Sequence, residues 1–515
     1  MSHTDTAALL ILIALWATVY LTHFPFFASP TQFPSVQQNS PSFNGSWYPP
    51  NQTQIDDLQA VINGTDAFGF IFSDAYTPPG KASDGIHNWC NMPHVNSETY
   101  PVPPAGYTLE YVEVVGPQPR EPATRRSMIA QDLQVHRHHK RTPYAANTFP
   151  QESYTWDCND EGLYSYGKPL NPSGNESVST YWSIYTSPSN PFAPQGFNGT
   201  CQFPQITRGG LDNSWQHGKD LSEVYKDRFG SRLVNPSDQV SYRVTNNVIT
   251  SQVAGMVVAA MYGEIAELPL AIQPASIDSL EPAYICDAGT ALSSSYGAGS
   301  TNPNWTEHLT ASQPLFDVLD NISGVAPNDP GFHQSWDHYF DNLSSRLCHG
   351  KPLPCKIGNS TSCITPSTAN SVFRLGLYEY SYIYRSASQS LSASAPSYGV
   401  YIAELAQNIR DNISRASPII YKHNVAHDGS LAMLLSILQV DVMVWPGLGA
   451  EIVFEIYEKD GERFVRILWG GDLFRSSNPE LGLVNMVPLD TLLGYFDGLV
   501  GIGASKVPKM CANTG

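Results

Sequence analysis

Positive charge is scarce in this sequence. Its 515 residues include 46 Asp and Glu but only 28 Lys and Arg, and the formal net charge is −18. Proteins that bind nucleic acids draw much of their affinity from Lys and Arg side chains that neutralise phosphates. A chain this acidic is therefore not expected to bind DNA or RNA.

The sequence also lacks an obvious membrane span. Residues 7–21 form a continuous apolar run, but a bilayer needs about 20 such residues. We expect residues 1–28 to be a signal peptide or, alternatively, a retained signal anchor, because no Lys or Arg precedes the run and no clear cleavage site follows it. Only a retained signal anchor would hold the rest of the chain at a membrane. Residues 29–55 are rich in Ser, Pro, Asn and Gln, which predicts a flexible arm.

None of the eight cysteines forms a CxxC pair, so the zinc sites that such pairs build are not expected. An even number of scattered cysteines is typical of disulfides in a secreted protein. We expect two of Cys348, Cys355 and Cys363 to bond to each other. Ten Asn-x-Ser/Thr sequons further predict a glycosylated protein that is extracellular or in the cell wall. The sequons lie at Asn44, Asn51, Asn63, Asn175, Asn198, Asn304, Asn321, Asn342, Asn359 and Asn412.

Hydrophobic residues make up 42% of the chain, which is enough for a large buried core. Residue alternation predicts a strand at 106–115, and helical spacing predicts a mostly buried helix at 246–264. Residues 451–469 have the pattern of a β-hairpin. The stretch 285–385 is rich in cysteines, sequons and helical pieces, and it predicts a separate helical subdomain pinned by disulfides.

The densest charge in the chain is the run RHHKRTP at residues 137–143. Basic runs are often solvated surfaces, nucleic-acid patches or targeting patches. Here the rest of the chain is acidic, so the run is an isolated positive spot. An isolated positive spot of this kind suits a small anion.

The segment that leads into this run holds three prolines and three arginines at residues 116–128. It separates the strand expected at 106–115 from a second strand-like ending at 133–135. We predict that residues 116–135 are an insertion between a strand and its catalytic turn, such as a retained intron would produce. An ordinary surface loop is the alternative.

A second chemical pair is His427 and Asp428, which fall where a strand is expected to end and an apolar helix to begin. This position corresponds to the C-terminal edge of a sheet, where open α/β sheets bind ligands and helix N-termini attract anions. The alternative is structural, with Asp428 as a helix N-cap and His427 as a loop residue.

Together these motifs resemble the histidine acid phosphatases, the branch of the histidine phosphatase superfamily that includes fungal acid phosphatases and phytases. The resemblance covers roughly residues 105–270 and 375–515. It depends on Arg-His-x-x-Arg-Thr-Pro at 137–143, on ITRGG to GKDL at 206–221, on the later His-Asp pair and on the hairpin that follows.

The resemblance implies an α/β fold of the phosphoglycerate-mutase type. This is a three-layer sandwich around a mixed, mostly parallel sheet, with a smaller, mainly helical subdomain inserted into it. The corresponding domains would be a discontinuous phosphatase domain at 56–284 and 386–515 and a helical cap at 285–385.

The resemblance also implies the roles of individual residues. His138 would attack the phosphorus of a phosphomonoester and form a phosphohistidine, while Arg137, Arg141 and His427 bind the phosphoryl oxygens. Asp428 would protonate the leaving alcohol and then act as the base for the attacking water. Imidazole is a competent nucleophile, and guanidinium groups match phosphate geometry. No cofactor is implied.

The sequence departs from the family at two positions. The family usually has Gly after the nucleophile, whereas this chain has His139, which would crowd the turn or contact substrate. The family also places a further phosphate-binding Arg at the start of the helix expected at 246–264, where this chain has Asn247. We predict that Arg243 takes this role, with Asn246 or Asn247 as a neutral phosphate ligand otherwise.

Two other interpretations compete with this one. His136 and His139 flank the nucleophile and could belong to a metal cluster, but without a companion carboxylate site we predict no metal. Glu451 and Glu455 could indicate a glycoside hydrolase. Their spacing on a strand favours structural carboxylates instead, and a glycoside hydrolase is the least favoured function.

We therefore predict a secreted acid phosphomonoesterase whose partner is its phosphomonoester substrate. The alternative is a catalytically weak glycoprotein of the same fold with a binding role. Because an ordinary carboxyl group is protonated only at low pH, we expect an acidic, bell-shaped profile limited by His138 below and Asp428 above. Few Lys and Arg lie in 285–385, which favours a general acid phosphatase over a phytase.

Overall fold

The computed structural model describes residues 45–68, 87–113, 132–151, 199–230, 239–263 and 268–512, together with short stretches between 155 and 191. The expected signal segment at 1–28 lies outside the described residues, as does most of the expected arm. The last part of that arm differs from the expectation, because it is bonded to the body. Trp47 Nε1 donates to the Arg385 carbonyl at 3.1 Å, and Arg385 Nη2 donates to the Tyr48 carbonyl at 2.7 Å.

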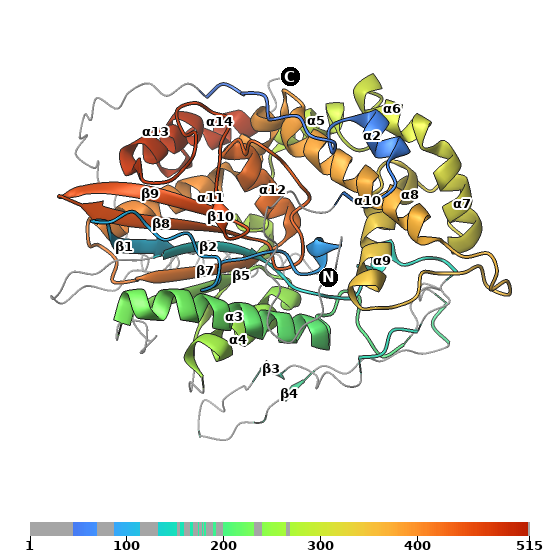
Figure 1. The fold of residues 1–515 in the computed structure, drawn as a ribbon, viewed down its shortest axis with the longest axis horizontal. Coiled ribbons are helices and arrows are strands. Elements are labelled where there is room, and N and C mark those ends of the chain that lie inside the picture. Colours follow the sequence, from blue (N-terminus) through green and yellow to red (C-terminus); the bar gives the residue numbers. More distant parts are fainter. Residues whose placement is uncertain are drawn as a thin grey trace, which may run out of the picture. The chain divides into compact units, whose positions relative to one another are not determined.

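A nine-stranded mixed sheet forms the centre of the fold and confirms the predicted α/β class (Figure 1). Five neighbouring strands are parallel, β8 runs antiparallel to β1 and β2, and β9 is antiparallel to β8 in a hairpin. Along the sheet the strands are β10 (Asp472–Leu473), β9 (Glu462–Trp469), β8 (Glu451–Lys459), β1 (Thr108–Glu113), β2 (Asp132–Arg137), β7 (Tyr421–Ala426), β5 (Val240–Val244) and β6 (Leu270–Ala271). Strand β11 (Val487–Pro488) pairs with β9, and β3 (Ser165–Gly167) and β4 (Thr180–Tyr181) form a separate ribbon.

Helices cover both faces of the sheet, which produces three layers (Figure 1). One face carries α3 (Arg208–Phe229) and α4 (Val248–Tyr262), and the other carries α11 (Ser390–Ile413), α12 (Asp428–Ile437), α13 (Leu489–Val500) and α14 (Val507–Cys511). Alternate residues of β8 supply the two cores, as the period of two in a strand requires. Phe454 packs in the core of α11–α13, whereas Val453 packs in the core of α3 and α4.

A group of helices follows β6 and lies at one end of the sheet (Figure 1). Its members are α5 (Asp287–Tyr296), α6 (Pro303–Ala311), α7 (Gln313–Ser323), α8 (Pro330–His333), α9 (Asp337–Cys348) and α10 (Pro366–Ser381). Helix α2 (Leu58–Asn63) packs against α10. The buried apolar side chains of α7–α10 belong to the same cluster as α11–α13, whereas Tyr296 of α5 belongs to a separate small cluster. The helical region therefore shares a core with the sheet.

All eight cysteines form disulfides. Cys355 pairs with Cys363, as the prediction of a local bond required, and Cys348 pairs with Cys90 instead. The remaining pairs are Cys158–Cys201 and Cys286–Cys511. Among the described residues, no helix is both long and apolar enough to cross a membrane.

Two of the predicted glycosylation sites are buried. Asn342 is 1% exposed and donates from Nδ2 to the Asn147 carbonyl, and Asn412 is 7% exposed and donates to the Ile419 carbonyl. A glycan cannot be accommodated on either amide in the folded chain. The exposed sequons in the described part are Asn51, Asn63, Asn304, Asn321 and Asn359.

Strands β1 and β2 pair with consecutive parts of the same partner strand. On β8, Glu113 lies opposite Phe454, and Gln134 lies opposite the next residue, Val453. Most of the suspected insertion at 116–135 lies outside the described residues, and its last four residues belong to β2. The two strands therefore have the register of a single strand that has been interrupted.

This register predicts the effect of an exact deletion. Removing residues 114–133 joins Glu113 to Gln134 and continues the pairing with β8, so we expect the shortened chain to fold with a melting temperature no lower than that of the full chain. The matched control removes residues 114–132, which shifts the register by one and turns the following side chains to the wrong faces. Thermal unfolding of both proteins tests this. Equal behaviour of the two deletions would contradict the shared register.

Candidate functional site

The two predicted motifs meet at one edge of the sheet. Arg137 at the end of β2 pairs in register with Ala426 at the end of the parallel strand β7. His138 and His427 are the residues that follow, and Asp428 begins α12. Because the C-terminal ends of parallel strands face the same way, the residues after both strands enter one cleft.

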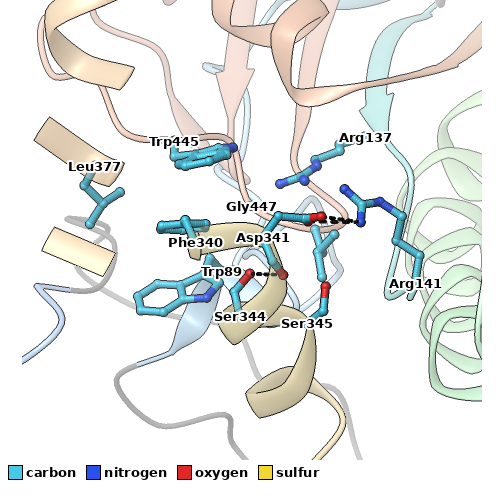
Figure 2. A pocket seen from close by; sticks show the side chains of 11 residues that line it. Trp89, Arg137, Arg141, Phe340, Asp341, Ser344, Ser345, Leu377, Trp445 and Gly447 are labelled. Carbon is cyan, nitrogen blue, oxygen red and sulfur yellow. Dashed lines mark hydrogen bonds and ion pairs between the residues drawn. The ribbon is translucent and has the colours of Figure 1, made fainter. Parts of the chain in front are cut away.

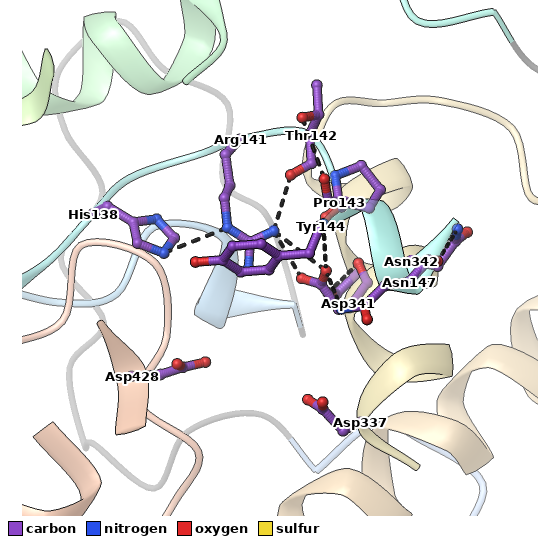
Figure 3. Close-up of polar contacts among 12 residues, drawn as sticks. His138, Arg141, Thr142, Pro143, Tyr144, Asn147, Asp337, Asp341, Asn342 and Asp428 are labelled. Carbon is purple, nitrogen blue, oxygen red and sulfur yellow. Dashed lines mark hydrogen bonds and ion pairs between the residues drawn. The ribbon is translucent and has the colours of Figure 1, made fainter. Parts of the chain in front are cut away.

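His138 is held as a neutral imidazole by hydrogen bonds at both ring nitrogens. Its Nδ1 donates to the His139 carbonyl at 3.0 Å, so the neutral ring carries its lone pair on Nε2. Arg141 Nε lies 3.4 Å from that Nε2 (Figure 3). Burial, with the nearby charges of Arg141 and Arg137, lowers the pKa of His138 well below its usual value. The ring is therefore uncharged even in mildly acidic solution.

Each arginine of the motif is matched by a carboxylate. Arg141 Nη1 lies 3.0 Å from Asp341 Oδ1, and Arg137 Nη2 lies 3.0 Å from Asp428 Oδ2. Arg137 Nη1 also donates to the Pro446 carbonyl at 2.5 Å. The Nε of Arg137 is buried and has no partner among the described residues. Both guanidinium groups therefore lie beside the nucleophile in a charge-compensated state.

Asp428 is positioned by the start of α12 and by an indole. Its Oδ1 accepts from the Gly429 amide at 2.9 Å, and its Oδ2 accepts from Trp445 Nε1 at 2.8 Å. Burial alone would raise its pKa, but Arg137, the Trp445 hydrogen bond and Arg141 together hold the pKa below its usual value. The free protein therefore carries this group as a carboxylate above strongly acidic pH.

His427 lies beside the nucleophile, with its ring centre 5.4 Å from that of His138. Its Nε2 lies 3.0 Å from Thr245 Oγ1, and its Nδ1 lies 3.4 Å from the Tyr144 hydroxyl. Glu281 Oε2 lies 3.5 Å from the same Nε2. The His427 ring is therefore held by Thr245, which follows β5, and by Tyr144, which lies in the loop after the basic run.

A pocket opens beside the two arginines, as Figure 2 shows. One side is apolar, with Trp89, Phe340 and Trp445, and the rings of Phe340 and Trp445 stack with centres 3.9 Å apart. The other side carries Arg137 and Arg141. The pocket can therefore hold an anion beside a flat apolar group.

Arg243 does not join this group. Its guanidinium is 1% exposed, lies 2.7 Å from Asp278 Oδ1 and 3.0 Å from Glu404 Oε2, and also bonds to Gln273 and Ser279. The prediction that Arg243 binds phosphate therefore does not agree with its contacts. The register of β5 leaves Thr245, two residues later, at the edge of the sheet beside His427.

Asn247 is the N-cap of α4, where its Oδ1 accepts from the Ile249 amide at 3.3 Å. Its own amide donates to Thr245 Oγ1, the atom that contacts His427. Asn247 thus lies near the site through its contact with Thr245, and its side-chain oxygen already caps α4.

His139 differs from what the sequence suggested, whereas the carboxylates Glu451 and Glu455 agree with it. His139 is fully buried and faces Ser214 and His217, so it neither crowds the turn nor faces the cleft. Glu451 and Glu455 are also fully buried, and Glu455 pairs with Arg466 at 2.5 Å. Neither carboxylate is accessible to a sugar, which agrees with their interpretation as structural groups.

Several site residues carried no recognisable signal in the sequence. Asp341 accepts from Arg141, from the Tyr144 amide at 3.2 Å and from Asn147 Nδ2 at 2.7 Å, and it comes from α9, about two hundred positions later. Trp445 comes from the loop before β8 and holds Asp428. An isolated Asp in a helix and a Trp in a loop have no distinctive spacing, so these contacts only become visible in three dimensions.

Comparison with known proteins finds distant similarity. No family model matches the chain. Counting factor 60 of Dictyostelium discoideum is 22% identical over 393 residues, which cover 73% of this chain and 87% of that protein. The Hafnia alvei phytase in complex with myo-inositol hexakis sulphate is 14% identical with a TM-score of 0.49, covering 78% of this chain and 99% of that one. The Klebsiella sp. ASR1 phytase has 14% identity, a TM-score of 0.46 and coverages of 81% and 98%.

The contacts of Arg243 predict a structural phenotype. Arg243→Met leaves the buried carboxylate of Asp278 without its cation, which typically costs about 3–5 kcal/mol of stability. We expect urea unfolding to show this loss, while the KM for an aryl phosphate changes little. Asn247→Ala is the matched variant, and loss of its cap should cost about 1 kcal/mol. If Arg243→Met has normal stability and a strongly raised KM, Arg243 binds phosphate as the sequence predicted.

Asp337 provides a prediction for pH. It begins α9, and Figure 3 shows its carboxyl group facing Asp428 across the cleft. The protein groups around its carboxyl group desolvate it and, with the carboxylates of Asp341 and Asp428, raise its pKa to about 7, although 49% of the side chain is exposed.

The folded chain therefore keeps a proton that the unfolded chain loses near pH 4, so stability falls as the pH rises from about 4 to 7. Asp337→Asn removes this dependence. We expect its melting temperature, relative to wild type, to increase steadily over that range. If the melting temperatures of the two proteins change with pH in parallel, Asp337 does not titrate in this way.

Proposed function

We propose that the protein is an acid phosphomonoesterase that works through a phosphohistidine on His138. The observation that carries this proposal is the lone pair on Nε2 of His138, which accepts from Arg141 Nε at 3.4 Å in a cleft that also holds Arg137 and Asp428. A lone pair beside two guanidinium groups suits attack on a phosphoryl group, whose equatorial oxygens the guanidinium groups can bind.

In the first step, Nε2 of His138 attacks phosphorus and a P–N bond forms as the P–O bond to the alcohol breaks. The proton on His138 Nδ1 stays on that nitrogen, and its hydrogen bond to the His139 carbonyl fixes the ring during attack. Arg137, Arg141 and His427 bind the phosphoryl oxygens. Asp428 gives its proton to the leaving oxygen, so the alcohol departs neutral and Asp428 becomes a carboxylate.

In the second step, a water molecule attacks the phosphohistidine on the face that the alcohol has left. Its proton passes to the Asp428 carboxylate, the P–N bond breaks, and the electron pair returns to Nε2. Inorganic phosphate leaves and Asp428 is again protonated, which restores the starting state. Every proton and electron pair is supplied by the protein, the ester or water.

The pKa of Asp428 supports activity in acid. Its lowered pKa means that only a small fraction carries the required proton at neutral pH. A bound phosphoryl group competes for Arg137, the cation that now stabilises the Asp428 carboxylate, and this raises the pKa of Asp428 in the complex. We expect the rate to increase as the pH falls into the acidic range.

The charges around the cleft favour a simple monoester over a polyphosphorylated one. The side of α9 carries Asp337, whose raised pKa keeps it neutral in acid, and Asp341, which is paired with Arg141, so neither offers a positive charge to further phosphates. In the helical region, the buried guanidinium groups of Arg346, Arg374 and Arg385 are already bonded to protein groups. The substrate we propose has one phosphate and a weakly charged, partly apolar alcohol.

The four disulfides support an oxidising compartment, and we propose that the protein acts outside the cell after secretion. The exposed sequons are compatible with this location.

Trapping of the intermediate tests the proposed chemistry. The substrate is 4-nitrophenyl phosphate labelled with ³²P, whose leaving group needs little help from an acid, and the reaction is stopped with alkaline detergent because the P–N bond is labile in acid. We expect transient label on the wild-type protein, accumulated label on Asp428→Asn, and none on His138→Ala. Asp337→Asn is the matched variant, since it removes another cleft carboxylate.

Each remaining outcome has a defined meaning. Label that accumulates on Asp337→Asn instead of Asp428→Asn would assign proton transfer to Asp337. Phosphate binding without turnover in wild type would favour the binding role, which the pairing of Arg137 with Asp428 makes chemically reasonable. Turnover that survives His138→Ala would overturn the proposal.

A further inference from the structure

A cluster of buried histidines lies directly behind the catalytic turn, on the side of α3. His136 belongs to β2, His139 follows the nucleophile, and His217 lies on α3. All three rings are fully buried, and each offers one nitrogen within 4.8 Å of the others. This cluster is separate from the phosphate cleft, and its argument does not depend on the proposed function.

The proton positions of His139 follow from its hydrogen bonds. Ser214 Oγ donates its only proton to the Gly210 carbonyl at 2.7 Å. The same oxygen lies 3.0 Å from His139 Nδ1, so it must accept a proton from that nitrogen. The lone pair of neutral His139 is therefore on Nε2, which faces the cluster.

His217 is oriented in the same way by a carboxylate. Its Nε2 lies 2.8 Å from Glu451 Oε2, and Glu451 Oε1 accepts from the Val95 amide at 2.6 Å. Donation from Nε2 to this carboxylate leaves the lone pair of His217 on Nδ1. Carboxylates often orient metal-binding histidines from the outer nitrogen in this manner.

Two lone pairs then face each other across the cluster. His139 Nε2 and His217 Nδ1 are 3.3 Å apart. Nitrogen ligands of tetrahedral zinc, at Zn–N distances of about 2.0–2.1 Å, are separated by about 3.3–3.4 Å. The spacing is therefore that of two ligands around one ion, and without a cation the two lone pairs repel each other.

The third nitrogen has no other role within the described structure. His136 Nε2 is buried without a hydrogen-bond partner, while its Nδ1 lies 3.2 Å from His423 Nε2. An unpartnered buried nitrogen costs free energy unless something binds it. One ring nitrogen of His136 lies within 4.8 Å of the ligand atoms of His139 and His217.

A fourth position is available beside Gly449. This residue has φ of +75°, and a Cβ atom there would lie 2.8 Å from His139 Nε2 and 3.6 Å from Asn91 Oδ1. Asn91 Oδ1 is itself buried and unpartnered in the part of the chain that the structure describes. The glycine keeps this side of the cluster open for a water or for the amide oxygen.

We propose that His136 Nε2, His139 Nε2 and His217 Nδ1 bind one Zn²⁺ ion. Three imidazoles with an open fourth position suit zinc, and no thiolate is needed. The ion would join β2, the catalytic turn and α3. It would fix His139, whose backbone carbonyl orients His138. The ion itself would not contact substrate. The sequence did not indicate this site because His217 and Glu451 come from distant elements.

Metal content tests the proposal on the full-length protein, expressed with zinc in the medium and dialysed against a weak chelator. We expect about one zinc per chain in wild type and a large loss in His217→Gln. His308→Gln is the matched control, because His308 is equally buried but pairs with Glu379 in the helical region. It should retain the zinc.

A second measurement keeps the test independent of how the variants fold. Wild type is unfolded with a strong chelator and refolded with Zn²⁺, with Co²⁺ or without metal. We expect a higher melting temperature with zinc and, with cobalt, the intense visible absorption of a four-coordinate ion. Wild type that contains no metal, and refolds equally well with and without zinc, would overturn the proposal. The 3.3 Å contact would then be held by a shared proton, with Glu451 protonated.

Discussion

The parallel pairing of β2 with β7 is the constraint on which the rest of the site depends. The register of Arg137 with Ala426 makes two segments, nearly three hundred residues apart in sequence, end at the same edge. The segments that follow the two strands both start from this edge, one in the turn after β2 and the other at the start of α12. His138 and His427 are brought together by backbone geometry before any side-chain contact is considered.

This arrangement concentrates positive charge, and the protein compensates for it locally. Arg141 faces Asp341 and Arg137 faces Asp428, so neither guanidinium is buried without a counter-charge. An arriving phosphoryl group must compete with these carboxylates. The competition has opposite consequences for the two pairs, because release of Arg137 favours protonation of Asp428, whereas release of Arg141 only frees Asp341. Anion binding and proton supply are thus coupled through Arg137.

The sequence allowed prediction of the features that depend on nearby residues. The hairpin β8–β9 and the helix α4 follow from local periodicity, whereas the α/β class was implied by the family resemblance. His138, Arg137 and Asp428 lie at strand ends where the motif placed them. Arg243 could not be assigned in the same way. A strand position specifies on which face a side chain lies, but the attraction of Asp278 and Glu404 decided where its guanidinium points.

The turn after β2 directs the side chains of the basic run to two different sides. Arg137, His138 and Arg141 face the cleft, while His136 and His139 face α3, where His217 lies. Burial lowers the pKa of His136, His139 and His217 well below the usual value, so this side of the turn carries no charge of its own. The arginines of the run therefore face the cleft. A turn that separates charged from neutral side chains in this way presents its arginines to an anion and leaves the lone pairs of the neutral imidazoles for the ion proposed behind them.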